Sequence, residues 1–252
     1  MERIVEKPHL PKGKVGLLAL GERYGAQLAA PLYALGVQAL WIPDARFSDG
    51  RLAGHADLRL LHLGGRRIVS ACGTDIDNIL TNRGFEVIPV PEPGEGYPRD
   101  CALNACIAGG RFFHRLDASS PEALANLPAG LETVNIAQGY AKCSVCVVDG
   151  CSVITADRGI AKAALSAGLD VLTVTPGYIE LEGFDCGFIG GASFKLAPDV
   201  MAFTGTLDGH PDRDAIISFL AVRGIKPLFL TGRPAFDIGS ALPLTAREPE
   251  IP

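Results

Sequence analysis

The feature of this sequence that most restricts its fold is a repeated pattern of a helical stretch, a glycine and an apolar strand. Each glycine stands after a helix, where the chain commonly needs a positive φ that glycine adopts without strain. The intervals between the copies vary, so the pattern favours one supersecondary unit with variable loops over a solenoid of identical turns. The five glycines are Gly36, Gly84, Gly130, Gly168 and Gly224.

A β-hairpin pattern precedes four of the five helices, because residues typical of tight turns separate two apolar runs there. The unit is therefore predicted to be strand, strand, helix, strand. The turns contain Gly64 and Gly65, Gly109 and Gly110, Asp149 and Gly150, and residues 197–199. The four complete units span residues 57–91, 100–137, 143–175 and 192–231.

The first unit lacks one strand, since residues 14–43 show only a strand, a helix and a strand. The apolar segment 236–245 would supply the missing strand if the chain closed into a ring, which also avoids an unpaired edge. The sequence thus predicts a single domain over residues 1–252, a five-fold pseudosymmetric α/β propeller closed by the C-terminal strand. A doubly wound fold fits less well, because residues 21–25 lack a phosphate-binding glycine motif. No cofactor is expected.

Charge and cysteine content narrow the partners and the compartment. The formal net charge is −5, so the chain is not expected to present the positive surface that binds nucleic acids or anionic membranes. The charged N-terminus and the lack of an apolar stretch of roughly 18 residues predict a cytoplasmic protein. Seven cysteines, an odd number without a secretory signal, are expected to be reduced thiols. A small molecule or a protein remains as the expected partner, and the oligomeric state is not predicted.

The repeat also predicts a site, because pseudosymmetry brings equivalent residues of the units around a common axis. Two carboxylates there can hold a planar cation, and a thiol is a strong nucleophile at neutral pH. In the alternative interpretation, Asp57 and Asp100 pair with Arg59 and Arg99 or cap turns, and Cys143 is an inert core residue. The equivalent positions are Asp57, Asp100, Cys143, Ala192 or Ser193, and, in the closing segment, Asp237 or Ser240.

Five such units, one of them opened by Tyr97-Pro98-Arg99-Asp100, resemble the guanidine-modifying or pentein superfamily of deiminases, dimethylarginine hydrolases and amidinotransferases. The resemblance implies that Asp100 grips a substrate guanidinium and that Arg158 stands where those enzymes carry an arginine. It also implies a thiol-dependent hydrolase or transferase acting on a guanidino or amidino small molecule. Residues 138–143, 187–192 and 236–240 are similar to an uncharacterised bacterial family assigned to this fold.

Two departures from the superfamily pattern affect the expected mechanism. Residues 237–242, where the hydrolases carry their nucleophilic cysteine, contain none, and no histidine stands near residues 190–193 to act as the general base. A relocated site is therefore predicted, with Cys143 as the nucleophile and His55 or His210 as the proton carrier. The alternative is a pentein without catalysis that binds a protein or a small ligand. The expected binding residues are Asp57, Arg99, Asp100, Arg158, Gly190, Gly191 and Asp237.

The remaining motifs have simpler interpretations. Cys143 and Cys146 form a lone C-x-x-C, and a strand over residues 142–148 would point the two thiols to opposite faces, so no metal site is predicted. His210 precedes a helix and has helix capping as its alternative role. The glycine pair at 190 and 191 permits close approach of a ligand or a neighbouring backbone, or else marks a β-bulge.

Overall fold

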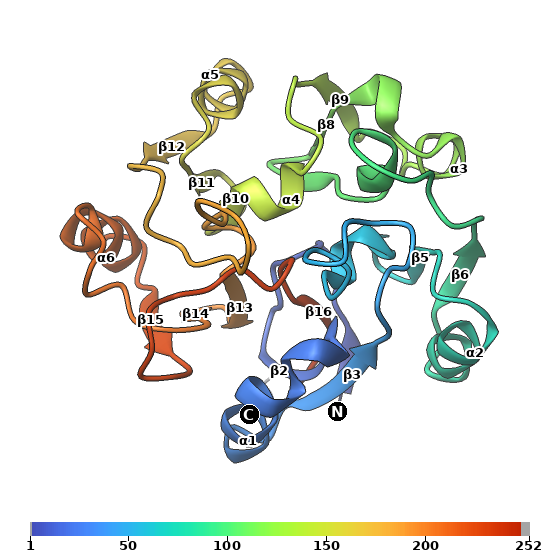
Figure 1. The fold of residues 1–252 in the computed structure, drawn as a ribbon, viewed down its shortest axis with the longest axis horizontal. Coiled ribbons are helices and arrows are strands. Elements are labelled where there is room, and N and C mark those ends of the chain that lie inside the picture. Colours follow the sequence, from blue (N-terminus) through green and yellow to red (C-terminus); the bar gives the residue numbers. More distant parts are fainter. Residues whose placement is uncertain (1, 248–252) are drawn as a thin grey trace.

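The computed structural model describes residues 2–247 and shows a mixed α/β protein with five small sheets around a central axis (Figure 1). Helices α1, α2, α3, α5 and α6 lie at the outside of the ring, while strands β10 (Val145–Val147), β13 (Ser193–Ala197) and β16 (Leu242–Arg247) lie near its centre. The predicted fold class, an α/β propeller of ββαβ units closed by the C-terminal strand, is confirmed.

Units two to five share one topology, in which the first strand runs antiparallel to the second and the third runs parallel to it. Unit two contains β4 (Leu60–Gly64), β5 (Arg67–Ser70), α2 (Thr74–Asn82) and β6 (Glu86–Pro89). Unit three contains β7 (Cys106–Ala108), β8 (Arg111–His114), α3 (Pro121–Ala125) and β9 (Glu132–Asn135). Unit four contains β10 (Val145–Val147), β11 (Ser152–Thr155), α5 (Arg158–Ser166) and β12 (Asp170–Thr173). Unit five contains β13 (Ser193–Ala197), β14 (Val200–Phe203), α6 (Arg213–Ala221) and β15 (Lys226–Phe229).

Unit one is assembled from both ends of the chain. It contains β2 (Lys14–Gly21), α1 (Gly25–Ala34), β3 (Gln38–Ile42), the closing strand β16 (Leu242–Arg247) and an outer strand β1 (Glu2–Ile4). Strand β16 runs antiparallel to β2, as predicted, but it begins at Leu242 rather than at Phe236. The difference has a physical reason: the amides of Ile238 and Ser240 donate to the Gly191 carbonyl at the axis, so this stretch cannot join the sheet.

Short helical turns precede several strands at the axis. They are η2 (Ala56–Leu58), η3 (Arg99–Cys101) and α4 (Ala141–Ser144). Two further turns, η1 (Glu22–Tyr24) and η4 (Leu116–Ala118), instead precede the helices α1 and α3.

The five glycines of the repeat all adopt positive φ, as predicted, with values between 67° and 91°. In unit three the helix ends at Ala125, and Gly130 follows an intervening loop that contains Pro128. Ser120 caps that helix as its sequence indicates, because its hydroxyl accepts a hydrogen bond from the Ala123 amide at 3.2 Å.

The apolar core lies between neighbouring units rather than within each one. In β2, Leu18 and Leu20 pack toward unit five, while Leu17 and Ala19 pack toward unit two. Alternate residues of a strand point to opposite faces, so a strand buried on both faces is apolar throughout. Similar clusters join units two and three, three and four, and four and five. Each unit therefore depends on its two neighbours to bury its side chains.

Within residues 2–247, no helix combines the length and apolar character that a membrane span requires. All seven cysteines are free thiols, and Cys151 is the exposed one.

Candidate functional site

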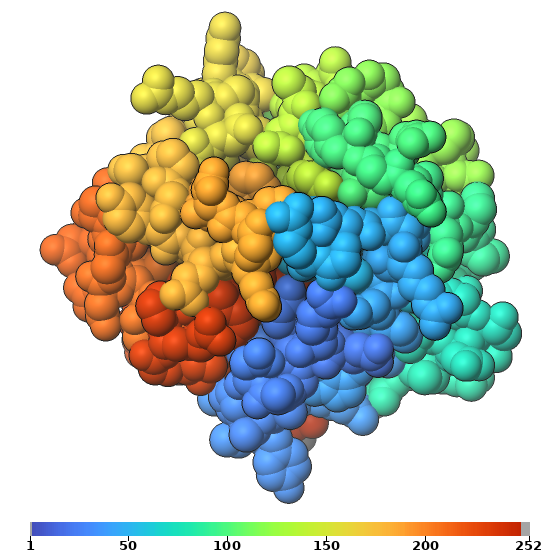
Figure 2. Space-filling model, in the orientation of Figure 1, coloured from blue at the N-terminus to red at the C-terminus, as the bar shows by residue number. Residues whose placement is uncertain are grey.

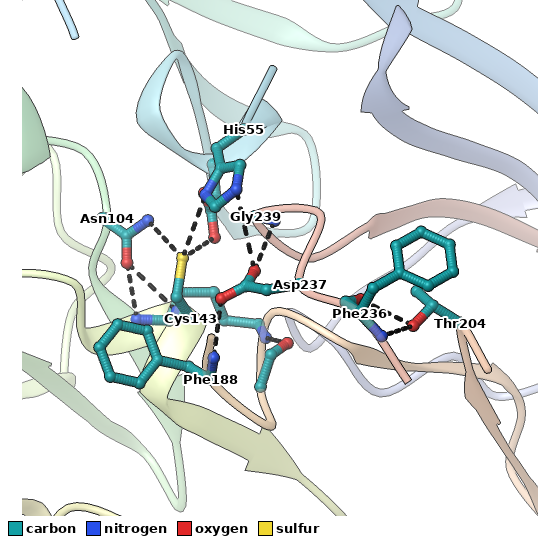
Figure 3. Close-up of polar contacts among 11 residues, drawn as sticks. His55, Asn104, Cys143, Phe188, Thr204, Phe236, Asp237 and Gly239 are labelled. Carbon is teal, nitrogen blue, oxygen red and sulfur yellow. Dashed lines mark hydrogen bonds and ion pairs between the residues drawn. The ribbon is translucent and has the colours of Figure 1, made fainter. Parts of the chain in front are cut away.

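Five segments meet at the centre of the ring, each just before the first strand of a unit. Cys143 lies in α4, a single helical turn, and not in the strand expected over residues 142–148. The turn allows its thiol to face the side chains of unit two and of the closing segment (Figure 3). Asp57 lies in η2 and Asp100 in η3, while Gly191 and Asp237 precede β13 and β16.

The Cys143 thiol is enclosed by polar side chains. It donates a hydrogen bond to Asp57 Oδ2 at 3.1 Å, and its sulfur lies 4.0 Å from His55 Nδ1. Asn104 Nδ2 donates to the sulfur at 3.3 Å. Cys143, Asp57 and His55 are only 1–2% exposed, and Asn104 is fully buried. The centre is therefore a closed cluster of a thiol, a carboxylate and an imidazole.

Asn104 fixes the turn that carries the thiol. Its Oδ1 accepts hydrogen bonds from the backbone amides of Lys142, at 2.9 Å, and of Cys143, at 3.3 Å. The sequence analysis did not identify this residue, and no motif around it indicates the role. The only available signal was its place four residues after Asp100 in the same axial segment.

Asp237 faces the other side of the His55 ring. Its Oδ1 lies 4.0 Å from His55 Nε2, and the carboxylate accepts hydrogen bonds from the Phe188 and Gly239 amides, both at 2.8 Å. Gly239 has φ +68°, and a side chain there would overlap His55. Two backbone donors thus hold Asp237 in place beside the imidazole.

The glycine pair at the start of unit five allows close approach, one of the two predicted roles. A side chain on Gly191 would overlap the Asp237 carboxylate, and one on Gly190 would overlap the backbone of Val145. The Gly191 amide also donates to the Cys143 carbonyl at 2.7 Å. The glycines therefore bring α4 and Asp237 together.

Burial controls the ionisation of the cluster. Desolvation raises the pKa of Asp57 to about 7, against the hydrogen bond from Cys143 and the charge of Lys142, which lower it. Burial and the charges of Asp57 and Asp237 raise the pKa of the Cys143 thiol well above its ordinary value. Burial also lowers the pKa of His55, although Asp237 opposes that shift. At neutral pH the closed site therefore contains a thiol, a neutral imidazole and a carboxyl group close to its midpoint.

Asp100 is buried but belongs to a separate polar group. Its Oδ2 accepts hydrogen bonds from the Tyr140 hydroxyl at 2.9 Å and from Ser48 at 3.4 Å, while Oδ1 has no hydrogen-bond partner among the described residues. It borders a cleft of about 790 Å³ that Tyr97 and Arg99 also line. Asp100 was expected to lie at the same axial site as the nucleophile. Its hydrogen bonds instead come from Tyr140 and Ser48, and the Cys143 thiol donates to Asp57.

The alternative pairing of Asp57 and Asp100 with arginines is wrong. Arg59 donates to the carbonyls of Ala71, Pro43 and Asp44 instead, and Arg99 is exposed.

Two further predicted site residues lie away from the thiol. His210 Nδ1 accepts a hydrogen bond at 3.0 Å from the amide of Asp212, the residue just before α6. Arg158 is exposed as the first residue of α5. Neither is part of the cluster around Cys143.

Residues 43–55, which we term the covering loop, close the centre from one face. This segment is seen in light blue at the middle of the surface in Figure 2, where the orange and green parts of the chain meet it. It carries a small apolar core that includes Phe47 and Leu52. Arg51 donates to the Gly183 carbonyl, and its guanidinium lies 4.0 Å from the centre of the Phe184 ring.

A second cleft, of about 900 Å³, borders the covering loop at Gly50 and Arg51. Asp237 and Tyr24 border it at the inner end, together with Arg51 of the loop and His210. The Asp100 cleft and this Asp237 cleft therefore flank the loop that covers the thiol.

The residues that could hold a metal ion differ from the C-x-x-C pair. One ligand atom each of His55, Asp57 and Cys143 lies within 4.8 Å of the other two. Cys146, in β10, instead contacts the Met201 sulfur at 3.9 Å.

The arrangement of the five units is the pentein fold. The structure is similar to the inosamine-phosphate amidinotransferase from Streptomyces griseus, with 11% identity, a TM-score of 0.57, and coverage of 99% of this chain and 98% of that chain. It is also similar to SxtG, an amidinotransferase from Microseira wollei in the saxitoxin biosynthetic pathway, with 10% identity, a TM-score of 0.60, and coverage of 96% and 97%. A third similar structure is DDAH from Pseudomonas aeruginosa complexed with citrulline, with 10% identity, a TM-score of 0.51, and coverage of 90% and 93%.

The chain belongs to a family of unknown function, DUF6873, whose profile matches residues 19–242. A search of curated proteins finds no matching sequence.

Proposed function

We propose that the protein is a thiol-dependent enzyme that acts on the amidino or guanidino group of a small molecule, with Cys143 as the nucleophile. One observation carries the proposal: the Cys143 sulfur lies 3.1 Å from Asp57 and 4.0 Å from His55 at the point where the five units meet. A nucleophile beside a base that is itself oriented by a third group is the general arrangement for covalent catalysis. Asp237, facing the second nitrogen of His55, is that third group.

The similar structures support the choice of substrate class. Two of them are amidinotransferases, and the third is a complex with citrulline. Their identity to this chain is 10–11%, so the likeness concerns the fold, and the activity is our proposal. The chemistry of the buried side chains agrees with it, because a cationic amidine would neutralise the carboxylates that raise the thiol pKa.

In the proposed reaction, the Cys143 sulfur forms a bond to the amidino carbon as the thiol proton passes to Asp57 or His55. The bond between this carbon and the leaving amine then breaks, and the amine takes up a proton. An amidino-thioether remains on Cys143. Water or a second amine attacks the same carbon, breaks the bond to sulfur and restores the thiol. Water would release a urea, and an amine would become the new carrier of the amidino group.

The midpoint of Asp57 suits the first proton transfer. Its pKa of about 7 matches the operating pH of an acid–base group at neutrality, which is the condition for efficient proton exchange. Once Asp57 is ionised, its carboxylate would also bind the amidinium group of the substrate. Because Cys143 is 1% exposed, we expect the covering loop to open so that the substrate can enter from one of the flanking clefts.

A second candidate is a pentein that binds a cationic small molecule or a protein without reaction. The observation that favours it is the closed thiol, whose pKa burial raises well above the ordinary value, so that the resting group is not nucleophilic. A cysteine-labelling experiment separates the two candidates.

The test compares two reagents that differ in charge, 2-chloroacetamidine and neutral 2-chloroacetamide. Both alkylate a thiolate and release chloride. We expect the cationic reagent to label Cys143 roughly tenfold faster or more, because even a few kcal/mol of attraction to Asp57 is worth that factor. The preference should disappear in Asp57→Asn and persist in Asp100→Asn. Peptide mass spectrometry identifies the labelled cysteine.

The control uses a Cys151→Ser background, because Cys151 is the exposed thiol and would react with both reagents. A Cys143 that is labelled only after unfolding would contradict the enzyme and favour the non-catalytic candidate. Equal rates for the two reagents would contradict the role of Asp57.

A further inference from the structure

We propose that His55, Asp57 and Cys143 also form a binding site for a thiophilic divalent metal ion of the Zn²⁺ type, and that metal and amidino compound exclude each other. The binding itself depends only on the three side chains, while the exclusion rests on the proposed function. Cys143 would then be a thiol that metal binding withdraws from reaction.

Two of the three distances between the side chains are close to those of a tetrahedral zinc site. Ordinary bonds from zinc to sulfur, nitrogen and oxygen place the ligand atoms about 3.4 to 3.6 Å apart at the tetrahedral angle. Here the sulfur lies 3.1 Å from Asp57 Oδ2 and 4.0 Å from His55 Nδ1, and no pair of ligand atoms is more than 4.8 Å apart. Shifts of a few tenths of an ångström in the side chains bring these two distances to those values, and the pair of His55 and Asp57 has to close by up to about 1.3 Å.

The surroundings of the ligands resemble the outer shell of a metal site. A metal-binding histidine usually has a carboxylate at its other ring nitrogen, and Asp237 is held there by two backbone amides. Asn104 donates to the sulfur, as the acceptor character of a thiolate requires. Both residues orient the ligands without competing for the same atoms.

Two buried polar atoms of the cluster lie beside the ligand atoms and lack a partner of their own. His55 Nε2 and Asp57 Oδ1 have no hydrogen-bond partner among the described residues, although both side chains are at least 98% buried. An unsatisfied buried polar atom carries a desolvation cost. Metal on His55 Nδ1 would fix the ring proton on Nε2, where it can donate to Asp237, 4.0 Å away, and so reduce this cost at the imidazole.

The donor set selects the class of metal. A thiolate and an imidazole prefer Zn²⁺ and similar borderline ions, whereas Ca²⁺ and Mg²⁺ prefer oxygen ligands. Three protein ligands leave a fourth position for water or an incoming group. Because binding displaces the thiol proton, the metal occupies the lone pair with which sulfur would attack carbon.

The experiment uses the full chain in the Cys151→Ser background, reduced, treated with a chelator and then titrated with Co²⁺. We expect one ion per chain and a thiolate-to-cobalt charge-transfer band, with Zn²⁺ displacing the cobalt. Cys143→Ser should lose the band, and His55→Gln should weaken binding by roughly a hundredfold or more. Asp237→Asn should keep the band and weaken binding by about 10–100-fold. Cys146→Ala is the matched control and should bind as the parent does.

Circular dichroism and melting temperature establish that each variant is folded. A folded parent that binds no Co²⁺, or a Cys143→Ser variant that keeps the band, would overturn the metal site. Labelling by 2-chloroacetamidine is measured in parallel in chelator and with saturating Zn²⁺. Labelling in chelator that Zn²⁺ does not suppress would overturn the exclusion. Metal binding without labelling in chelator would instead count against the proposed function alone.

Discussion

Asp57 and Asp100 occupy equivalent positions of units two and three, and they are 1% and 2% exposed. Their neighbours nevertheless differ. Asp57 accepts a hydrogen bond from the Cys143 thiol, whereas Asp100 accepts hydrogen bonds from Tyr140 and Ser48. Burial raises the pKa of both carboxyl groups, but two hydroxyl donors oppose this shift at Asp100. The position in the repeat thus determines where each carboxyl group lies, and non-equivalent neighbours determine its chemistry.

The two aspartates also depend on different parts of the chain. Around Asp57 the site is completed by the closing segment, which contributes Asp237 and Gly239. Around Asp100 it is completed by Ser48 of the covering loop and by Tyr140, three residues before the thiol. Changes to one group should therefore leave the other largely intact, and each prediction below tests that separation.

The largest effect is expected from deleting residues 235–252, which removes Asp237 and the central strand β16. Leu242, Leu244 and Ala246 lose their buried positions, and each large side chain contributes about 2–5 kcal/mol. The loss approaches or exceeds the total stability of a typical domain, about 5–15 kcal/mol. We expect aggregation or the absence of a cooperative melt by circular dichroism. Normal melting would show that neither aspartate depends on the closing segment.

The next effect is a pH dependence of stability that differs between the two aspartates. Asp57 has a pKa of about 7 in the folded state and 3.8 ordinarily. Because the folded pKa is raised, the contribution of Asp57 to the free energy of unfolding is greatest below about pH 4 and is lost as the pH rises toward 7. Over that pH range the free energy of unfolding falls by up to roughly 4 kcal/mol, because each pKa unit of difference corresponds to about 1.4 kcal/mol.

We therefore expect Asp57→Asn to remove most of this slope in urea unfolding measured at several pH values. Asp100→Asn should remove less, because hydrogen bonds from Tyr140 and Ser48 stabilise the ionised form. Equal changes in the two variants would contradict the comparison.

A single methyl group tests the closing segment more locally. Gly239→Ala places a side chain at φ +68° against His55, so we expect a loss of about 1–3 kcal/mol in the free energy of unfolding and slower labelling of Cys143. Gly150→Ala is the matched control, since no atom lies within 4 Å of the new methyl group. Its free energy of unfolding should change by no more than about 0.5 kcal/mol. An undisturbed Gly239→Ala variant would show that the His55 contact is not tightly packed.

The contrast between the aspartates also explains what could be predicted from the sequence. The repeat predicted the propeller, the closing strand and the gathering of Asp57, Asp100, Cys143 and Asp237 near one axis, since these follow from local periodicity. The contacts between them could not be predicted. They depend on the helical turn of α4, which the pattern at residues 142–148 concealed, and on the conformation of the covering loop.

Asn104 illustrates the same limit. Its three hydrogen bonds to residues 142 and 143 cross between units, 38 and 39 residues along the chain, and no local pattern encodes such a contact.

The smallest effect is expected from Tyr140→Phe, which deletes the hydroxyl that donates to Asp100. One hydrogen bond of this kind contributes about 1 kcal/mol to the free energy of unfolding. Because the hydroxyl favours the ionised carboxyl group, its removal raises the Asp100 pKa further. The loss should therefore be largest at alkaline pH and fade as the pH falls and Asp100 becomes protonated.

Tyr33→Phe, at a side chain that is 85% exposed, is the control and should change nothing measurable. Labelling of Cys143 by 2-chloroacetamidine should stay within about twofold of the parent, since the thiol interacts with Asp57 rather than with Asp100. A loss of labelling as large as that in Asp57→Asn would mean that the two carboxyl groups act on the thiol as one unit.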